Sequence, residues 1–471
     1  MVGKESKMKN KFIRKWLVIL TVAAMMIPAG IPANAETVEE GENIAPTAGI
    51  SAETPNVTAE TQKEEISAEM PDMTAETQNE EKSDVQAEGQ NQAKQGVLEA
   101  VRQNTEKAEE ASDAVDVQAE ERTAGEVQIG EQIYPTLTEA FAAAKDGDVL
   151  RLLENAEVSQ PILLTKNVTL DTNGFTVSAA AGFKGNFMFT NRGTFNIVGS
   201  GKIDGSVGTY PLIMINNTGG AVLNIQSSEI TGQGVVQNVG GIVNITGGTL
   251  TASARNTVLS QFGEVHIGAS AHLMAAGEGK SAVQLIGAKM TLSGDAVLSG
   301  NGGIDVFNSN RNEEGTVSAQ VEITGGRIET KDFPVSGNNQ ESAGAEVAIT
   351  GGSLKNISGG TAIYWPMEGQ RTIGGNAVIE GGTGIEAKMG TITIKDNAVI
   401  TGSGEWKEEK PQNGGANPEG SAFLGSAQMY DGCINDSSLV VNILGGTLKS
   451  VNGNAVTIYN TEEKSDVRAD I

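Results

Sequence analysis

Apolar and polar residues alternate with a period of two along most of the chain beyond residue 148. The alternation recurs in one phrase, which reads VNITGGTL at 243–250, VEITGGRI at 321–328, VAITGGSL at 347–354 and VNILGGTL at 441–448. In the first copy Val243 and Ile245 flank Asn244, so one face of a short strand is buried and the other is wet. Two glycines then allow a sharp corner, and a second short strand follows.

Each repeat contains a third apolar phrase. Examples are AVQLI (282–286), GIDVF (303–307), AIYW (362–365), GIEAK (384–388), AFL (422–424) and AVTIY (455–459). The first strands of most repeats end 20 to 31 residues apart, which is the spacing of a solenoid. Three short strands per repeat predict the triangular coils of a parallel β-helix over 127–460, with about a dozen coils stacked ~4.8 Å apart.

A different period precedes the strands. Leu137, Ala140, Phe141 and Ala144 fall at i, i+3, i+4 and i+7, which predicts one amphipathic helix within 136–146. A stack of coils has an open first edge that can pair with other chains. We therefore expect this helix to cap that edge.

The start of this region resembles a known group of proteins. The helix, KDGDV (145–149) and KNVTLDTNGFTV (166–177) resemble the first coils of right-handed parallel β-helix proteins of the pectate-lyase-like superfamily. The ITGG coils resemble those of large secreted or surface proteins of Gram-positive bacteria within it. The resemblance implies an all-β, right-handed parallel β-helix. It leaves activity open, because the superfamily includes lyases, hydrolases, phage fibres and adhesins.

The N-terminus has the pattern of an export signal. Six basic residues lie within the first 15 positions, the apolar run WLVILTVAAMMI (16–27) follows, and Ala33-Asn34-Ala35 forms a small-residue cleavage site. This pattern predicts a signal peptide over 1–35 that is cleaved after Ala35. The apolar run is shorter than the ~20 residues of a membrane span. We expect a secreted or cell-surface protein with no transmembrane segment in the mature chain.

Residues 36–126 differ sharply from the coils. They hold 24 acidic and 6 basic residues and no Phe, Trp or Tyr. Residues 50–65 and 66–81 are near copies of each other. Such a segment cannot bury enough apolar surface to order itself, so we expect a disordered acidic spacer. Residues 461–471 contain EEKSDVRADI, which resembles EEKSDVQAEG (80–89), and are expected to be an acidic tail or the start of a second spacer.

Charge limits the partners. Residues 127–471 hold 21 basic and 34 acidic residues, a net charge of −13. Nucleic-acid-binding domains are usually basic, so we expect no nucleic-acid partner. An anionic polymer such as pectate would also bind unfavourably without calcium.

No linear catalytic motif is present. The Asn-Thr-Asp, Asp-Asp, Gly-His-Gly and Arg-x-Lys motifs of polygalacturonase-like members do not occur in the sequence, and neither His266 nor His272 lies in such a motif. Aligning the third strands places Gln284, Asp305, Tyr364, Glu386 and Thr457 in one outward column. Asp305 and Glu386 are weak candidates for an acid cluster. Two intervening coil steps would separate them by ~10 Å, too far to share one calcium ion. The favoured interpretation is a solvated face, with no catalytic residue, metal or cofactor.

Long loops between the strands offer a second candidate. Loops on a rigid scaffold often carry binding sites, and an exposed aromatic ring beside polar groups suits a sugar. The candidate ligand-contact residues are Trp406, Tyr430, Arg311 and Asp431. Insertions without a ligand are the alternative interpretation of these loops.

Two functions fit these features. The first is an exported, non-enzymatic β-helix that serves surface display or adhesion and contacts a polysaccharide or a host or cell-surface glycan. The second is a polysaccharide lyase or glycoside hydrolase of the pectate-lyase-like fold, whose acids converge in space without a linear motif.

Overall fold

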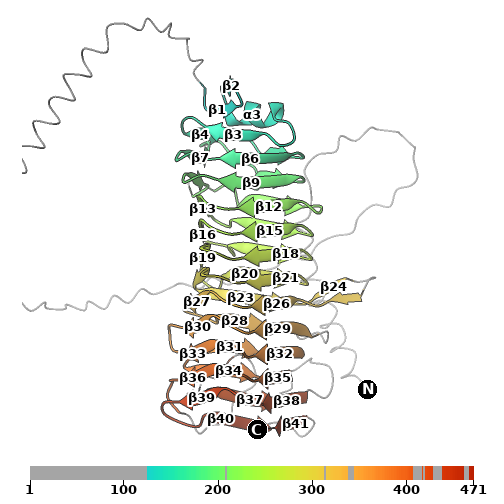
Figure 1. Ribbon diagram of the computed structural model, residues 1–471, viewed down its shortest axis with the longest axis vertical. Helices are drawn as coiled ribbons and strands as arrows, with labels where there is room; N and C mark the ends of the chain where they lie inside the picture. Colours follow the sequence, from blue (N-terminus) through green and yellow to red (C-terminus); the bar gives the residue numbers. More distant parts are fainter. Residues whose placement is uncertain are drawn as a thin grey trace, which may run out of the picture. The chain divides into compact units, whose positions relative to one another are not determined.

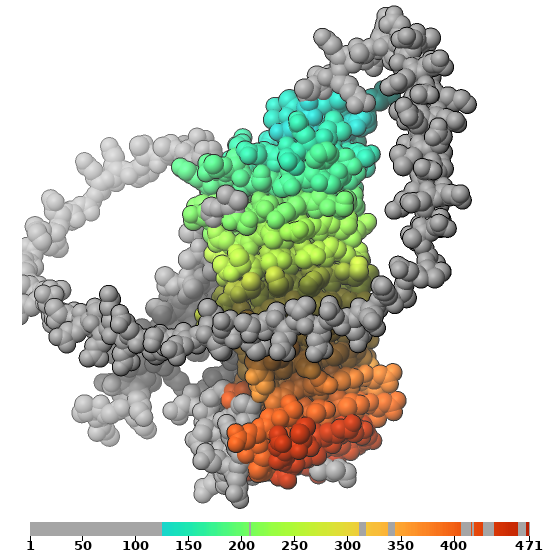
Figure 2. Space-filling view, turned by 90° about the vertical axis from the view of Figure 1, so that its left-hand side faces the viewer, coloured from blue at the N-terminus to red at the C-terminus, as the bar shows by residue number. Residues whose placement is uncertain are grey.

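The computed structural model describes residues 125–206, 209–311, 315–337, 344–406, 416, 419–427, 438–460 and 466–470. These residues form a parallel β-solenoid whose coils stack in chain order (Figures 1 and 2). The predicted signal peptide and nearly all of the predicted spacer lie outside the described residues. No helix in the described part of the chain is long and apolar enough to cross a membrane.

Three sheets run along the solenoid, with 15, 12 and 12 strands. Sheet A contains β1 (Val127–Ile129), β2 (Gln132–Tyr134), β3 (Val149–Leu152), β6 (Asn167–Asp171), β9 (Thr194–Val198), β12 (Val222–Ile225), β15 (Ile242–Ile245), β18 (Glu264–Ile267), β21 (Lys289–Leu292), β26 (Gln320–Ile323), β29 (Ala345–Ile349), β32 (Gly369–Ile373), β35 (Gly390–Ile394), β38 (Ser438–Ile443) and β41 (Asp466–Asp470). Sheet B contains β4 (Ala156–Val158), β7 (Thr176–Ala179), β10 (Lys202–Asp204), β13 (Glu229–Gly232), β16 (Thr249–Ala252), β19 (His272–Ala275), β22 (Val297–Gly300), β27 (Arg327–Thr330), β30 (Ser353–Asn356), β33 (Val378–Gly381), β36 (Val399–Gly402) and β39 (Thr447–Ser450).

Sheet C contains β5 (Ile162–Leu164), β8 (Phe187–Asn191), β11 (Ile213–Thr218), β14 (Val236–Val239), β17 (Val258–Gln261), β20 (Ser281–Ile286), β23 (Gly302–Phe307), β28 (Val335–Gly337), β31 (Thr361–Trp365), β34 (Thr383–Ala387), β37 (Phe423–Ala427) and β40 (Val456–Asn460). A hairpin of β24 (Ser309–Arg311) and β25 (Gly315–Val317) projects from the solenoid (Figure 1). Three strands per coil and about a dozen coils confirm the fold predicted from the repeat.

The repeated phrase works as the sequence predicts. Val243 and Ile245 are buried, whereas Asn244 lies on the outer face of β15. Gly248 has a φ of +83°, a conformation that residues with a side chain rarely adopt. A Cβ on Gly247 would lie 2.3 Å from the carbonyl oxygen of Gln226 in the preceding coil. The two glycines therefore make both the corner and the close stacking of coils possible.

Helix α3 (Leu137–Ala143) lies at the first coils, where it packs beside β1 and β4 (Figure 1). It is shorter than the predicted 136–146, because Ala144 leaves the helical conformation with a ψ of 148°. The hydroxyl of Thr136 caps its N-terminus by accepting a hydrogen bond from the Glu139 N–H at 3.2 Å. Its apolar side is buried as the period predicts: Leu137 and Ala140 are fully buried and Phe141 is 8% exposed.

Both ends of sheet A carry strands that the hydrophobic pattern did not predict. At the first end β1 and β2 form an antiparallel hairpin, and β1 pairs with β3. At the other end β41 pairs in parallel with β38, within the segment that the sequence predicts to be an acidic tail. Backbone hydrogen bonds build this strand, and its charged sequence DVRAD has no run of apolar residues to reveal it.

Candidate functional site

The outer face of sheet A carries a column of side chains that are polar at every position but one. The strands are parallel and in register, so equivalent residues of successive coils stack above one another. In chain order the column reads Thr169, Asn196, Asn224, Asn244, His266, Thr291, Glu322, Ala348 and Thr372. His266 therefore faces outward, as its place between Val265 and Ile267 predicts.

The first half of this column uses its hydrogen-bonding groups internally. The Asn244 amide donates to the Oδ1 of Asn224 at 2.8 Å, and the Asn224 amide donates to the Oδ1 of Asn196 at 2.7 Å. The Asn196 amide in turn donates to the Thr169 hydroxyl at 3.2 Å. In this part of the face the side-chain amides form a ladder of hydrogen bonds to one another.

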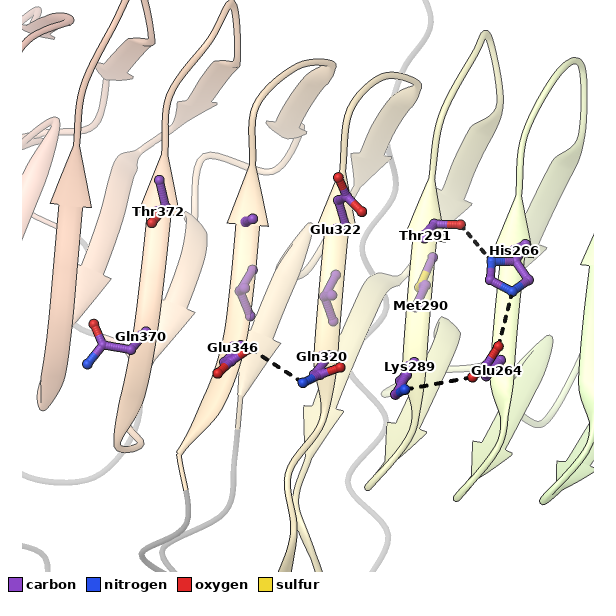
Figure 3. A pocket seen from close by; sticks show the side chains of 13 residues that line it. Glu264, His266, Lys289, Met290, Thr291, Gln320, Glu322, Glu346, Gln370 and Thr372 are labelled. Atoms are coloured by element: carbon purple, nitrogen blue, oxygen red, sulfur yellow. Dashed lines mark hydrogen bonds and ion pairs between the residues drawn. The ribbon is translucent and has the colours of Figure 1, made fainter.

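Beyond Asn244 the same face is hollowed into a shallow groove of about 460 Å³ across β18, β21, β26, β29 and β32 (Figure 3). Two rows of side chains line it. One row continues the column from His266 to Thr372, and the other reads Glu264, Lys289, Gln320, Glu346 and Gln370. Every coil contributes one side chain to each row.

At the β18 end the charged groups of the groove are paired. Glu264 lies 3.8 Å from the ammonium of Lys289 and 3.6 Å from Nε2 of His266. The other imidazole nitrogen of His266 lies 2.9 Å from the Thr291 hydroxyl. The carboxylate, the ammonium and the imidazole are thus held in one network (Figure 3).

At the β32 end most of the polar side chains are not paired with one another. The Gln320 amide donates to Glu346 at 3.4 Å. Within the described part of the chain, the side chains of Glu322, Gln370 and Thr372 make no hydrogen bond or ion pair. Between Glu322 and Thr372 the column holds only the methyl group of Ala348. This end of the groove therefore offers a carboxylate, an amide and a hydroxyl to a ligand.

The predicted acid pair lies elsewhere, on sheet C. The aligned column is confirmed, but the structure inserts two residues that the alignment missed, Ser336 between Asp305 and Tyr364, and Leu424 between Glu386 and Thr457. Asp305 and Glu386 are therefore three coil steps apart rather than two. The prediction missed β28 because its sequence, VSG, contains a single apolar residue.

The predicted solvated face is wrong at Glu386, whereas Asp305 keeps an intermediate exposure. Glu386 is fully buried, and its Oε1 lies 3.6 Å from the ammonium of Lys388, which is equally buried. The Lys388 ammonium also lies 5.5 Å from the centre of the Tyr364 ring. Burial lowers the pKa of Lys388, and the neighbouring Glu386 opposes that shift.

Asp305 is partly buried between two serines. Its Oδ2 accepts a hydrogen bond from the Ser281 hydroxyl at 3.0 Å, and its Oδ1 accepts one from Ser336. Burial raises the pKa of Asp305 and the charge of Asp332 adds to this, whereas the hydrogen bonds from Ser336 and Ser281 oppose it. The raised pKa means that the native state holds this carboxylate less favourably than water does.

We expect Asp305→Asn to be more stable than the parent at neutral pH. A group whose native pKa is raised loses stability as the pH rises from its ordinary pKa of 3.8 through the raised value. The asparagine escapes this loss and still hydrogen bonds to both serines. Urea unfolding across acidic and neutral pH should show an advantage that grows with pH. An advantage that is constant with pH would contradict the assignment.

The loop-edge candidates are placed only in part. Trp406 is half-buried, and a Cβ on Gly453 would lie 2.4 Å from its indole ring, so one face of the ring packs against the backbone of Gly453. Arg311 ends strand β24 of the projecting hairpin, but its side chain lies outside the described part. Tyr430 and Asp431 also lie outside the described residues. The described residues therefore do not test whether these four side chains form one site.

Sequence reasoning missed the groove. Its residues occupy ordinary outward positions of the repeat, and polar residues occur at such positions in every coil. The one distinguishing signal was the change within a single column from Asn to His, Thr, Glu and Ala. Among the described residues, no group of three or more His, Cys, Asp or Glu side chains could hold a metal ion.

Comparisons with known proteins identify no relative of this chain. No family model, no curated protein and no solved structure matches the chain. The parallel β-solenoid is therefore established by the structure alone, and membership of the pectate-lyase-like superfamily stays a hypothesis based on the resemblance of short motifs.

Proposed function

We propose that this protein is an exported, non-enzymatic β-helix that contacts a polysaccharide or a cell-surface glycan through the groove on sheet A. The observation that carries the proposal is the unpaired end of the groove, where Glu322 on β26 and Gln370 and Thr372 on β32 present hydrogen-bonding groups on either side of β29. Surface display or adhesion is the role that fits such a contact.

The geometry suits an extended, hydroxyl-rich ligand. Successive coils repeat every ~4.8 Å, so a linear chain lying along the solenoid axis meets a new pair of side chains at each step. Amides, hydroxyls and carboxylates can bind sugar hydroxyls, which both donate and accept hydrogen bonds. The export signal predicted at the N-terminus would bring the protein to compartments where polysaccharides occur.

A glycan array with the chain that begins at Glu36 tests the proposal. We expect Gln370→Ala/Thr372→Ala to weaken binding to the preferred glycan by about 1–3 kcal/mol, because each neutral hydrogen bond contributes about 0.5–1.5 kcal/mol. Thr249→Ala/Thr251→Ala, on the outer face of β16 in sheet B, is the matched control and should bind as the parent does.

Trp406→Ala separates the groove from the loop edge. If the loop edge holds the ligand instead, this variant should lose about 1 kcal/mol or more of binding energy, and the groove variant should lose none. Release of unsaturated sugars from a bound polysaccharide would identify a lyase and replace the proposal. The absence of binding to any glycan on the array would refute it.

A further inference from the structure

We propose that the groove on sheet A selects linear glycans that carry free amino groups. This inference rests on the proposed function and adds the chemistry of the ligand. Two features point to it: the uneven pairing of charges along the groove, and the small side chain of Ala348 in its lining, with the unpartnered side chains of Glu322, Gln370 and Thr372 on the neighbouring strands.

The charges of the groove are not balanced. Three carboxylates line it, those of Glu264, Glu322 and Glu346, against one ammonium. The ammonium of Lys289 lies against Glu264, which also contacts His266. Within the described part of the chain, Glu322 and Glu346 have no cationic partner. The β26–β32 end of the groove is therefore anionic, in a chain with a formal net charge of −26.

Ala348 lies beside these two carboxylates in the lining of the groove. Ala348 follows Glu346 by two residues on β29 and is the register partner of Glu322 on β26. On its other side the register partner is Thr372, whose neighbour in the second row is Gln370. The register thus places two acids, a hydroxyl and an amide on the strands around this small residue, and Figure 3 labels these four polar side chains.

An amino sugar matches this arrangement better than the alternatives do. An ammonium group donates three hydrogen bonds and carries a positive charge, which suits Glu322 or Glu346. Its sugar hydroxyls suit the unpartnered amide of Gln370 and hydroxyl of Thr372. A lysine-rich peptide would use the acids but has no side-chain hydroxyl for these two groups. A divalent cation takes six or more oxygen ligands, and among the described residues no group of three or more His, Cys, Asp or Glu side chains could hold a metal ion.

Calorimetry with two sugar probes tests the inference. The probes are a β-1,4-linked glucosamine hexamer, at a pH at which its amines are protonated, and the same hexamer fully N-acetylated. We expect the full chain to bind the amino hexamer about tenfold more tightly, since an exposed ion pair contributes up to about fivefold and two are available. Added salt should reduce this preference.

Variants locate the effect. Glu322→Gln/Glu346→Gln should lose most of the preference for the amino hexamer. Glu154→Gln/Glu157→Gln removes the same charge from exposed positions near the first coils and should keep the preference. Both double variants replace exposed side chains, and equal melting temperatures would show that folding is unaffected.

The outcomes separate the two proposals. Equal binding of both hexamers, or binding of another neutral glycan with no preference for amines, overturns this inference and leaves the proposed function standing. A preference that survives Glu322→Gln/Glu346→Gln also overturns it. Tighter binding of a hexalysine peptide than of the amino hexamer would assign the groove to a peptide. If no glycan binds at all, both proposals fail.

Discussion

Phe141→Asp is expected to lower the free energy of unfolding by ~3 kcal/mol or more, through the loss of a buried ring and the burial of a charge. The ring of Phe141 joins α3 to the first coils: its centre lies 5.9 Å from that of Phe189 and 6.0 Å from that of Phe195, in edge-to-face geometry. Phe189 lies in sheet C and Phe195 in sheet A, so one side chain ties the helix to two sheets.

The matched control is Ala142→Asp, which adds the same charge to the exposed side of the same helix. It should lower the free energy of unfolding by only about 1 kcal/mol, the cost of aspartate relative to alanine in the last turn of a helix. Urea unfolding and light scattering measure both variants. If α3 protects the first edge of the solenoid, Phe141→Asp should also aggregate, because exposed strand edges pair with other chains. Equal melting temperatures for the two variants, without added aggregation, would exclude a capping role.

The repeat predicts most of the fold because one physical constraint acts on every coil. A coil buries its inward side chains only when it stacks on its neighbours, so residues such as Val243, Ile245 and Gly248 recur at fixed positions. Where a coil departs from the pattern, prediction fails. Strand β28 was missed because Val335 is its only apolar side chain, and this omission misplaced Glu386 relative to Asp305 by one coil.

The candidate site was harder to predict, since outward positions are free to vary. Glu322 and Gln370 alternate with buried residues as any wet position does, and no motif marks them. The groove depends on which residues become neighbours across coils. Loops of different lengths separate the strands, so the sequence does not show directly which residues are register partners. The burial of Glu386 was also invisible, because the period of two assigns it to the wet side.

Arg371 is the clearest departure from the pattern, because it puts a charged side chain at a position that is apolar in the adjacent coils. It occupies the inward column that Val347 and Ile392 hold in the adjacent coils, and it is 4% exposed. Its guanidinium lies 4.3 Å from the centre of the Trp365 ring. Burial lowers the pKa of Arg371 well below its ordinary value, and the charge of Glu368 opposes that shift. A charge in this column needs compensation from the backbone.

That compensation is a set of carbonyl groups at the corner between sheets C and A. The guanidinium donates to the carbonyl oxygens of Met367 at 2.5 Å, Gly369 at 2.8 Å and Met389 at 3.4 Å, and also to that of Glu368. Arg371 thus holds the corners of two successive coils. Gln370 and Thr372, its neighbours in β32, are two of the unpartnered groups of the groove.

We expect Arg371→Leu to lower the free energy of unfolding by about 3 kcal/mol. Leucine fits the aliphatic column and removes the cost of a buried charge, but it leaves buried carbonyls without a donor at about 1–3 kcal/mol each. Arg371→Lys should lose less, because an ammonium keeps the charge and some donors but not the planar fork. Gln370→Leu, at the exposed neighbouring position, is the control and should change stability by less than about 0.5 kcal/mol.

Urea unfolding ranks these variants, and hydrogen exchange locates the effect. The order of stability should be parent, Arg371→Lys, then Arg371→Leu, with faster amide exchange concentrated in β32 and β35. If Arg371→Leu is as stable as the parent, the carbonyls have other partners and the arginine is not what holds the corner. If exchange accelerates equally in distant coils such as β12, the effect is global, and Arg371 does not act locally on the strand that carries Gln370 and Thr372.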